Sequence, residues 1–127
     1  MKRVIVAVQN KLVSEVVAYS LKNHNMLVEQ TCEHTPQGIV NACETLFADV
    51  LVMDVTRFGD GAFSNRLQSV YAVKTAIRKV KICLVCDNVS DADLSVKVAN
   101  AKTMGVIDSF FYQSVPSDYI ADVISTL

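Results

Sequence analysis

The sequence has few of the residues that break or cross-link a chain, and it has no long apolar run. It contains no tryptophan, four glycines, two prolines and four cysteines among 127 residues. Four cysteines are few for a secreted domain of this size that depends on disulfides. The first apolar run, Val4–Val8, is too short for a signal peptide, and no other run approaches the length of a membrane-spanning helix. We therefore predict a cytoplasmic protein without a membrane segment.

Neither sign of charge is in excess, because 12 basic residues stand against 13 acidic ones and the net charge is −1. Such a balance does not attract polyanions, so we expect no direct nucleic-acid binding by this domain. Half of the residues (51%) are hydrophobic, which is enough to fill a core and argues against disorder. At this length, residues 1–127 are expected to form one domain.

The cysteines do not indicate a disulfide or a metal site. Cys83 and Cys86 match the C-x-x-C spacing of redox and zinc sites, but they lie in "VKICLVC", which is predicted to be a strand. Side chains three residues apart on a strand point to opposite faces, so we expect both thiols to be structural. Cys32 and His34 would share one strand face, but two ligands without further partners do not make a metal site.

Apolar runs alternate with segments of helical period along the whole chain. Several runs are rich in β-branched residues and lack alternation, which is typical of strands covered on both faces. The five predicted strands are Val4–Val8, Met26–Thr31, Val50–Val55, Val80–Val85 and Ile107–Tyr112. Alternation of strand and helix predicts an α/β fold. We expect a flavodoxin-like, doubly wound parallel sheet of strand order 2-1-3-4-5, with helices 1 and 5 on one face and helices 2, 3 and 4 on the other.

The helices are predicted from their apolar faces and end signals. Thr35 is expected to cap the second helix, with Pro36 at its first position, and Ser90 to open the fourth. The first helix is predicted to present Val13, Val16, Val17 and Leu21 on one face. The second is predicted to present Ile39, Cys43, Leu46 and Phe47, and the third Phe63, Leu67, Val70, Tyr71, Lys74 and Ile77.

One carboxylate interrupts the third strand, "VLVMDV", near its end. In a doubly wound sheet of this order, ligands collect at the carboxyl ends of strands 1 and 3, where the winding reverses. Asp54 is therefore predicted to lie at the position where a functional site is expected. A purely structural role, in which the carboxylate accepts hydrogen bonds from the following loop, remains an alternative.

The order of elements, the length and Asp54 together resemble the receiver domain of bacterial response regulators. The resemblance covers nearly the whole chain, including the glycine-containing loop after Asp54 and "GVIDSFF" before the end of the fifth strand. It implies a phosphoacceptor aspartate, two acidic residues after strand 1 that help to hold Mg²⁺, a Thr or Ser ending strand 4, and a Lys near the end of strand 5.

The chain departs from that pattern at almost every position except the acceptor. Gln9 and Asn10 stand in place of the acidic pair, Cys86 in place of Thr or Ser, and Tyr112 in place of Lys. Two neutral amides remove two charges that would attract a divalent cation, and each such interaction is worth roughly 4 kcal/mol at about 4 Å and an effective dielectric constant near 20. The resemblance therefore predicts a degenerate, or pseudo-receiver, pocket without metal or cofactor. Thr56 and Arg57 complete this pocket.

Within this pocket, Gln9, Asn10 or Arg57 is expected to hold the carboxylate of Asp54. Two other functions stay open. In one, Asp54 is a working phosphoacceptor and Gln9 and Asn10 still position Mg²⁺. In the other, the fold carries an enzyme or cofactor protein, although the loop after strand 1, "QNKLVSEV", has neither the glycine of a phosphate loop nor the cysteine of a small phosphatase.

The resemblance implies a non-enzymatic signalling module that acts on a protein partner or a fused output domain. Receivers dimerise through the face of helix 4, strand 5 and helix 5, and the aromatic residues Phe110, Phe111 and Tyr112 of this chain fall on that strand. We therefore expect this face to mediate association, including a possible homodimer. The chain is expected to be either a stand-alone regulator or a receiver from a longer protein with a C-terminal output domain.

Overall fold

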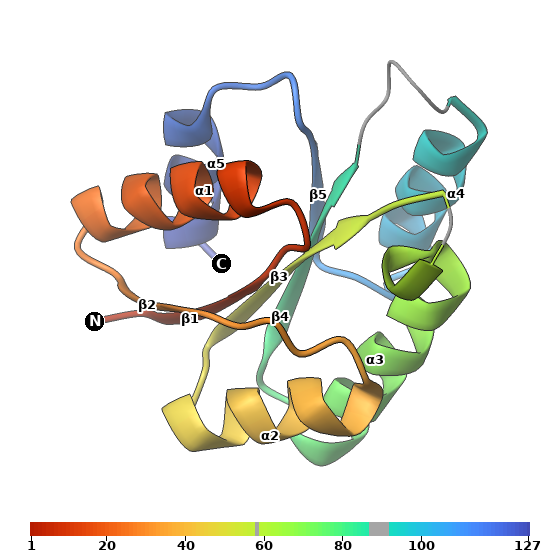
Figure 1. Cartoon of the computed structure of the whole chain (residues 1–127), viewed down its shortest axis with the longest axis horizontal. Helices are drawn as coiled ribbons and strands as arrows, with labels where there is room; N and C mark the ends of the chain where they lie inside the picture. The colour runs from red at the N-terminus through yellow and green to blue at the C-terminus, as the bar shows by residue number, and fades with distance from the viewer. Residues whose placement is uncertain (58, 87–91) are drawn as a thin grey trace.

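The computed structural model describes residues 1–57, 59–86 and 92–127 (Figure 1). Its strands are β1 (Arg3–Ala7), β2 (Leu27–Gln30), β3 (Val50–Val55), β4 (Lys81–Cys86) and β5 (Ser109–Tyr112). Its helices are α1 (Lys11–Asn23), α2 (Pro36–Leu46), the 3₁₀ turn η1 (Gly59–Gly61), α3 (Phe63–Ala76), α4 (Ala92–Thr103) and α5 (Ser117–Ser125). The predicted start of the fourth helix at Ser90 lies outside the described residues.

The five strands form one parallel sheet in the order β2-β1-β3-β4-β5, which confirms the predicted topology. Two apolar layers cover it. Ile39, Val70 and Val98 from α2, α3 and α4 pack on one face, and Val17 and Ile120 from α1 and α5 pack on the other. Figure 1 shows these two layers on opposite sides of the twisted sheet. The assignment of helices to faces is therefore also confirmed.

Strand β4 separates its two cysteines as predicted. Cys83 belongs to the core under α1 and α5, and Cys86 to the core under α2, α3 and α4. Both thiols are buried, and neither forms a disulfide. Cys32 and His34 differ from the prediction, because β2 ends at Gln30 and both residues follow it in an exposed loop. The loop begins early because Thr31 already turns, with its hydroxyl accepting a hydrogen bond from the Glu33 amide.

The helix starts are better predicted than the helix faces. Thr35 caps α2 by accepting a hydrogen bond from the Gly38 amide, as expected. Phe47, in contrast, is the C-cap of α2 in a left-handed conformation, and its side chain is exposed. Helix α3 buries Arg66, Ser69, Val70 and Val73, whereas Tyr71 points to solvent. The predicted face of α3 is confirmed at Val70, Phe63 and Ile77, but the prediction wrongly included Tyr71 and left out the buried Arg66.

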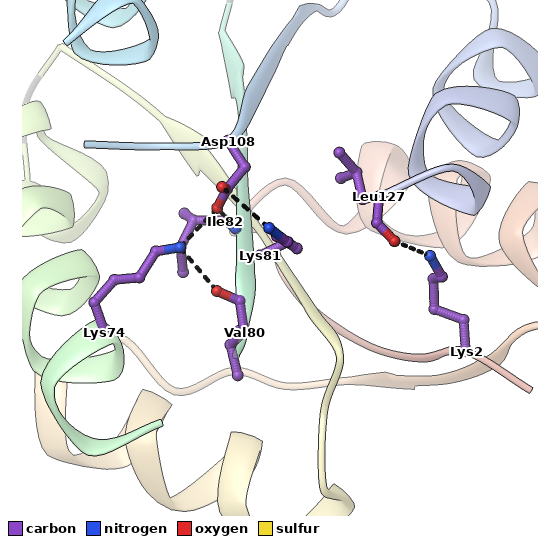
Figure 2. Close-up of polar contacts among 7 residues, drawn as sticks. All are labelled: Lys2, Lys74, Val80, Lys81, Ile82, Asp108 and Leu127. Atoms are coloured by element: carbon purple, nitrogen blue, oxygen red, sulfur yellow. Dashed lines mark hydrogen bonds and ion pairs between the residues drawn. The ribbon is translucent and has the colours of Figure 1, made fainter. Parts of the chain in front are cut away.

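At the amino edge of the sheet, ion pairs fasten α3 to the last two strands (Figure 2). Lys74 donates to the Asp108 carboxylate at 2.8 Å and to the Val80 carbonyl at 2.9 Å. Asp108 also accepts from the Ile82 amide. Close to the other end of this edge, Lys2 donates to the carbonyl oxygen of Leu127. These contacts lie away from the carboxyl edge, so we assign them to stability.

Candidate functional site at the carboxyl edge of β3

Asp54 lies at the carboxyl end of β3, where the sequence places it, but it is almost wholly buried. Only 1% of the residue is exposed, and its partner in the register of β3 and β4 is the apolar Val85. A carboxylate removed from water needs a charged or hydrogen-bonding partner, because an unpaired buried charge costs several kcal/mol. The partner therefore decides what Asp54 can do.

That partner is Arg66, on the buried face of α3. Its Nη2 atom donates to Asp54 Oδ1 at 2.7 Å and to the Ala7 carbonyl at 3.2 Å, and its Nε atom donates to the Asp54 carbonyl at 2.8 Å. Arg66 is the largest fully buried side chain of the described residues. One guanidinium thus binds oxygen atoms at the ends of β1 and β3, and it joins α3 to both strands.

The prediction that Gln9, Asn10 or Arg57 holds Asp54 was wrong. The carboxylate pairs with Arg66, which is outside the predicted set. Asn10 instead caps α1, since its Oδ1 atom accepts a hydrogen bond from the Val13 amide at 3.2 Å. A helix cap is a stable use for an amide oxygen. Asn10 therefore supports the local fold rather than the carboxylate.

Backbone and side-chain hydrogen bonds hold Thr56, just after β3, and η1 together. The Thr56 amide donates to the Gly61 carbonyl, and Asn65 donates from its side chain to the Gly59 carbonyl. A Cβ atom added to Gly61 would lie 2.6 Å from Thr56 Oγ1 and 2.9 Å from Gln9 Oε1. Gln9 and Thr56 are thus packed against the backbone of Gly61, and a larger residue there would push the loop outward.

The remaining predicted pocket residues are on neighbouring strands. Cys86 pairs with Val55 in the register of β3 and β4, and its thiol is buried in the core under α2, α3 and α4. Tyr112 is half-buried and pairs with Cys86 across β4 and β5. The structure brings Asp54 and Arg66 into direct contact, whereas Cys86 and Tyr112 belong to the wall of the core.

The aromatic residues of β5 divide between the two faces of this edge strand. Phe111 is buried, and its ring lies 6.2 Å from that of Tyr119 on α5. Phe110 and Tyr112 are half-buried and contact each other edge to face at 5.6 Å. Exposed apolar side chains flank the strand in sequence, with Val96 on α4 and Tyr119 on α5.

A cleft of about 480 Å³ opens beside this site, between the ends of β1 and β2. Gln9, Lys11, Cys32 and His34 line it, and His34 Nε2 lies 3.7 Å from the Asp60 carboxylate. Within the described ranges, however, no three His, Cys, Asp or Glu side chains are arranged to hold a metal ion. None of the helices described there is long and apolar enough to cross a membrane.

Comparison with known proteins gives the fold. No protein-family model matches the chain, and no curated protein does. A solved structure from a family of redox sensors in the streptococci, evolved from two-component response regulators, matches with a TM-score of 0.76 and 13% identity. The match covers 99% of this chain and 50% of that one, so this chain spans half its length. The chain has the fold of response-regulator receiver domains.

Two further receiver structures match over almost their whole length. An orphan response regulator of H. pylori has a TM-score of 0.75 at 13% identity, with 98% of this chain and 94% of that chain covered. A response regulator from Thermotoga maritima, in complex with Mg²⁺ and BeF, has a TM-score of 0.71 at 15% identity, with 99% and 98% covered. At such identities the likeness establishes the receiver fold and leaves the site to be read from this chain's own residues.

Sequence reasoning missed Arg66, the residue that dominates the site. It lies four residues before Val70 and seven before Val73, which are both buried on α3. A charged residue at that spacing lies on the apolar face of the helix. This was the signal available in the sequence. It predicts a buried charge, and a buried charge needs a counter-charge such as Asp54.

Proposed function

We propose that this chain is a receiver-like module of signal transduction whose output does not depend on phosphorylation of Asp54. One observation carries the proposal, namely the ion pair of 2.7 Å between Arg66 and the buried carboxylate of Asp54. The receiver fold supplies the class of function. The paired carboxylate of Asp54 is the reason to propose that this module does not use phosphorylation.

The ion pair opposes phosphoryl transfer in two ways. An acyl phosphate forms when a carboxylate oxygen approaches a phosphoryl group, and bound cations must offset the repulsion between them. Here Asp54 Oδ1 already accepts a strong hydrogen bond from a guanidinium in a site closed to water. The phosphodonor would have to displace Arg66, which is held by two backbone carbonyls as well.

The residues that the structure describes at this edge also do not fit Mg²⁺. Mg²⁺ requires several oxygen ligands in near-octahedral arrangement, usually including carboxylates. The oxygen of Asn10 is engaged in capping α1, Gln9 is packed on Gly61, and Asp54 is neutralised by Arg66. We therefore propose that the module is not an enzyme, uses no metal or cofactor, and transmits its signal by contact with a protein.

The surface formed by α4, β5 and α5 remains the predicted contact face for such a partner or a fused output domain. Half-buried Tyr112 and exposed Tyr119 support it, because aromatic side chains are enriched in protein interfaces. A cytoplasmic location and the absence of nucleic-acid binding by this domain likewise remain predictions.

Titration calorimetry with Mg²⁺ tests the proposal. The natural sequence is expected to give no binding heat in the low millimolar range. A matched variant carrying Gln9→Asp, Asn10→Asp and Arg66→Met restores the acidic pair and removes the competing cation, and Asp is as good a helix cap as Asn. This variant should bind Mg²⁺ if it folds. Low-millimolar binding by the natural sequence would instead favour the working phosphoacceptor.

A further inference from the structure

Helix α1 presents three large apolar side chains to solvent along one side. Leu12 is 72% exposed, Val16 46% and Tyr19 68%. Their spacing of four and three residues places them on a single face of the helix. Val16 was predicted to be buried. We call Leu12, Val16 and Tyr19 the α1 stripe.

An apolar groove of about 220 Å³ runs beside the α1 stripe, between α1 and α5. Leu12 and Val16 form one wall, and Val115 and Ile120 form the other. The stripe and the groove together make a surface with a ridge and an adjoining recess. A surface of this shape can pack against another helix, with ridge side chains entering the groove.

We infer that the α1 stripe is a contact surface for a second copy of this chain. Its three side chains present on the order of 400 Å² of apolar area, taking 150 to 250 Å² for a fully exposed aromatic ring. A standard interface buries about 800 Å² per partner, a little over half of it apolar. The stripe and the groove therefore supply most of the apolar core that a weak dimer needs.

The charges around the α1 stripe are compatible with self-association. On the side toward β2 lie Lys11 and Glu15, which both border the cleft next to Gln30, and helical periodicity places Lys22 on the same side three turns after Lys11, so this side carries two lysines and one glutamate. On the side toward α5 lie Asp118 and Asp122. A two-fold axis parallel to α1 would set the lysine side of one copy against the aspartate side of the other. The surface thus carries both charges that a matching copy requires.

This contact is independent of the ion pair at Asp54, and it shares α5, but not α4 or β5, with the surface of α4, β5 and α5. The low net charge of −1 leaves little overall repulsion between copies. The inference concerns this chain alone and does not rely on the proposed signalling role.

Sedimentation velocity over the micromolar range, up to about 500 µM, tests the inference. The natural sequence is expected to show a concentration-dependent dimer. Tyr19→Asp should raise the dissociation constant at least about tenfold, because it buries a charge against the apolar core of the interface. Tyr71 on α3 is 57% exposed, against 68% for Tyr19, so Tyr71→Asp is the matched control and should not change the dissociation constant. Circular dichroism establishes that each variant is folded.

Charge exchange gives a second measurement that does not depend on the apolar residues. Lys22→Glu should weaken the dimer, and Lys22→Glu combined with Asp118→Lys should restore it. A protein that stays monomeric at every concentration would overturn the inference and would leave the α1 stripe to a different protein. A dimer abolished by Tyr112→Asp but unaffected by Tyr19→Asp would also overturn it, since that dimer would use the face of α4, β5 and α5.

Discussion

Arg66 Nη2 lies 2.7 Å from Asp54 Oδ1, with the two side chains only 1% and 2% exposed. The same guanidinium donates to the carbonyl oxygens of Ala7 and Asp54, so α3 is fastened to β1 and β3 through one side chain. Charge-assisted hydrogen bonds of this length in a buried site are among the stronger polar contacts in proteins. The pair fixes the geometry of the carboxyl edge.

Breaking this pair should be costly. Arg66→Met leaves the Asp54 carboxylate buried without its partner, and we expect the free energy of unfolding to fall by about 3 to 5 kcal/mol. Urea denaturation measures the change. Arg78→Met, on an exposed arginine, is the matched control and should stay within about 0.5 kcal/mol of the natural sequence.

Removing both charges should cost less than removing one. Asp54→Leu combined with Arg66→Met replaces the ion pair by apolar side chains, which often restores or exceeds the original stability. We expect the double variant to be more stable than Arg66→Met alone. If Arg66→Met were no less stable than Arg78→Met, Arg66 would not be held as the structure shows.

Asp108 should make stability depend on pH in the acid range. Burial raises its pKa, but the hydrogen bonds from Lys74 and the Ile82 amide, with the charges of Lys74 and Lys81, outweigh burial and leave the pKa below 3.8. The ionised form therefore stabilises the fold above pH 3.8, and this contribution is lost as the pH falls through the folded-state pKa. Asp108→Asn should lower the free energy of unfolding at neutral pH. Urea denaturation at several acidic pH values should show this loss of stability, relative to the natural sequence, becoming smaller as the pH falls.

Exposed Glu29 offers the control for Asp108. The free energy of unfolding of Glu29→Gln should differ little from that of the natural sequence at every pH. A deficit for Asp108→Asn that persists unchanged in acid would contradict an ionic role for Asp108.

His24 should make stability depend on pH in the opposite sense. The Ser20 carbonyl raises its pKa, burial lowers it, and the Asp122 carboxylate 3.0 Å away raises it further, so that the net pKa lies above 6.5. The stabilisation is fully present below pH 6.5 and is lost as the pH rises through the folded-state pKa. The melting temperature of His24→Gln should lie further below that of the natural sequence at about pH 5.5 than at about pH 8.5. Asp122→Asn should lower the melting temperature in the same pH-dependent way. An equal drop in melting temperature at both pH values would contradict the stabilising contact between protonated His24 and Asp122.

The cysteines should differ sharply in reactivity. Burial raises the pKa of Cys43 and Cys83 to about 12, and Cys86 is also buried. Cys32 is exposed. Because the thiolate is the reactive form, an aromatic disulfide reagent should modify one thiol in the folded protein and the other three only after unfolding. Fast reaction of a second thiol in the folded state would show that β4 or α2 opens readily.

The sequence predicts the fold well because each buried strand leaves a continuous apolar run. Strands covered on both faces, as in "VLVMDV", differ clearly from the helical segments between them. The position of Asp54 follows from the same order, since its strand ends at the point where the winding reverses. These features depend on local pattern and connection rules alone.

The partner of Asp54 was not predicted, because the tilt and register of α3 against the sheet are tertiary features. Helical periodicity places Tyr71 and Leu67 on the inner face as readily as Val70 and Val73. A tyrosine is also more often buried than an arginine. The buried stripe instead begins with Arg66. The exposure of Val16 was missed for a similar reason, since sequence cannot show how far α5 extends over α1.

Intact-mass spectrometry after treatment with acetyl phosphate and Mg²⁺ tests phosphorylation independence most directly. Because Arg66 occupies the carboxylate, and because we propose that the described residues of this edge do not bind Mg²⁺, the mass of the natural sequence should not change. Restoring Gln9→Asp, Asn10→Asp, Cys86→Thr and Tyr112→Lys, together with Arg66→Met, should allow some modification. A prompt gain of one phosphoryl group by the natural sequence, lost in Asp54→Ala, would contradict the proposal and identify Asp54 as a working phosphoacceptor.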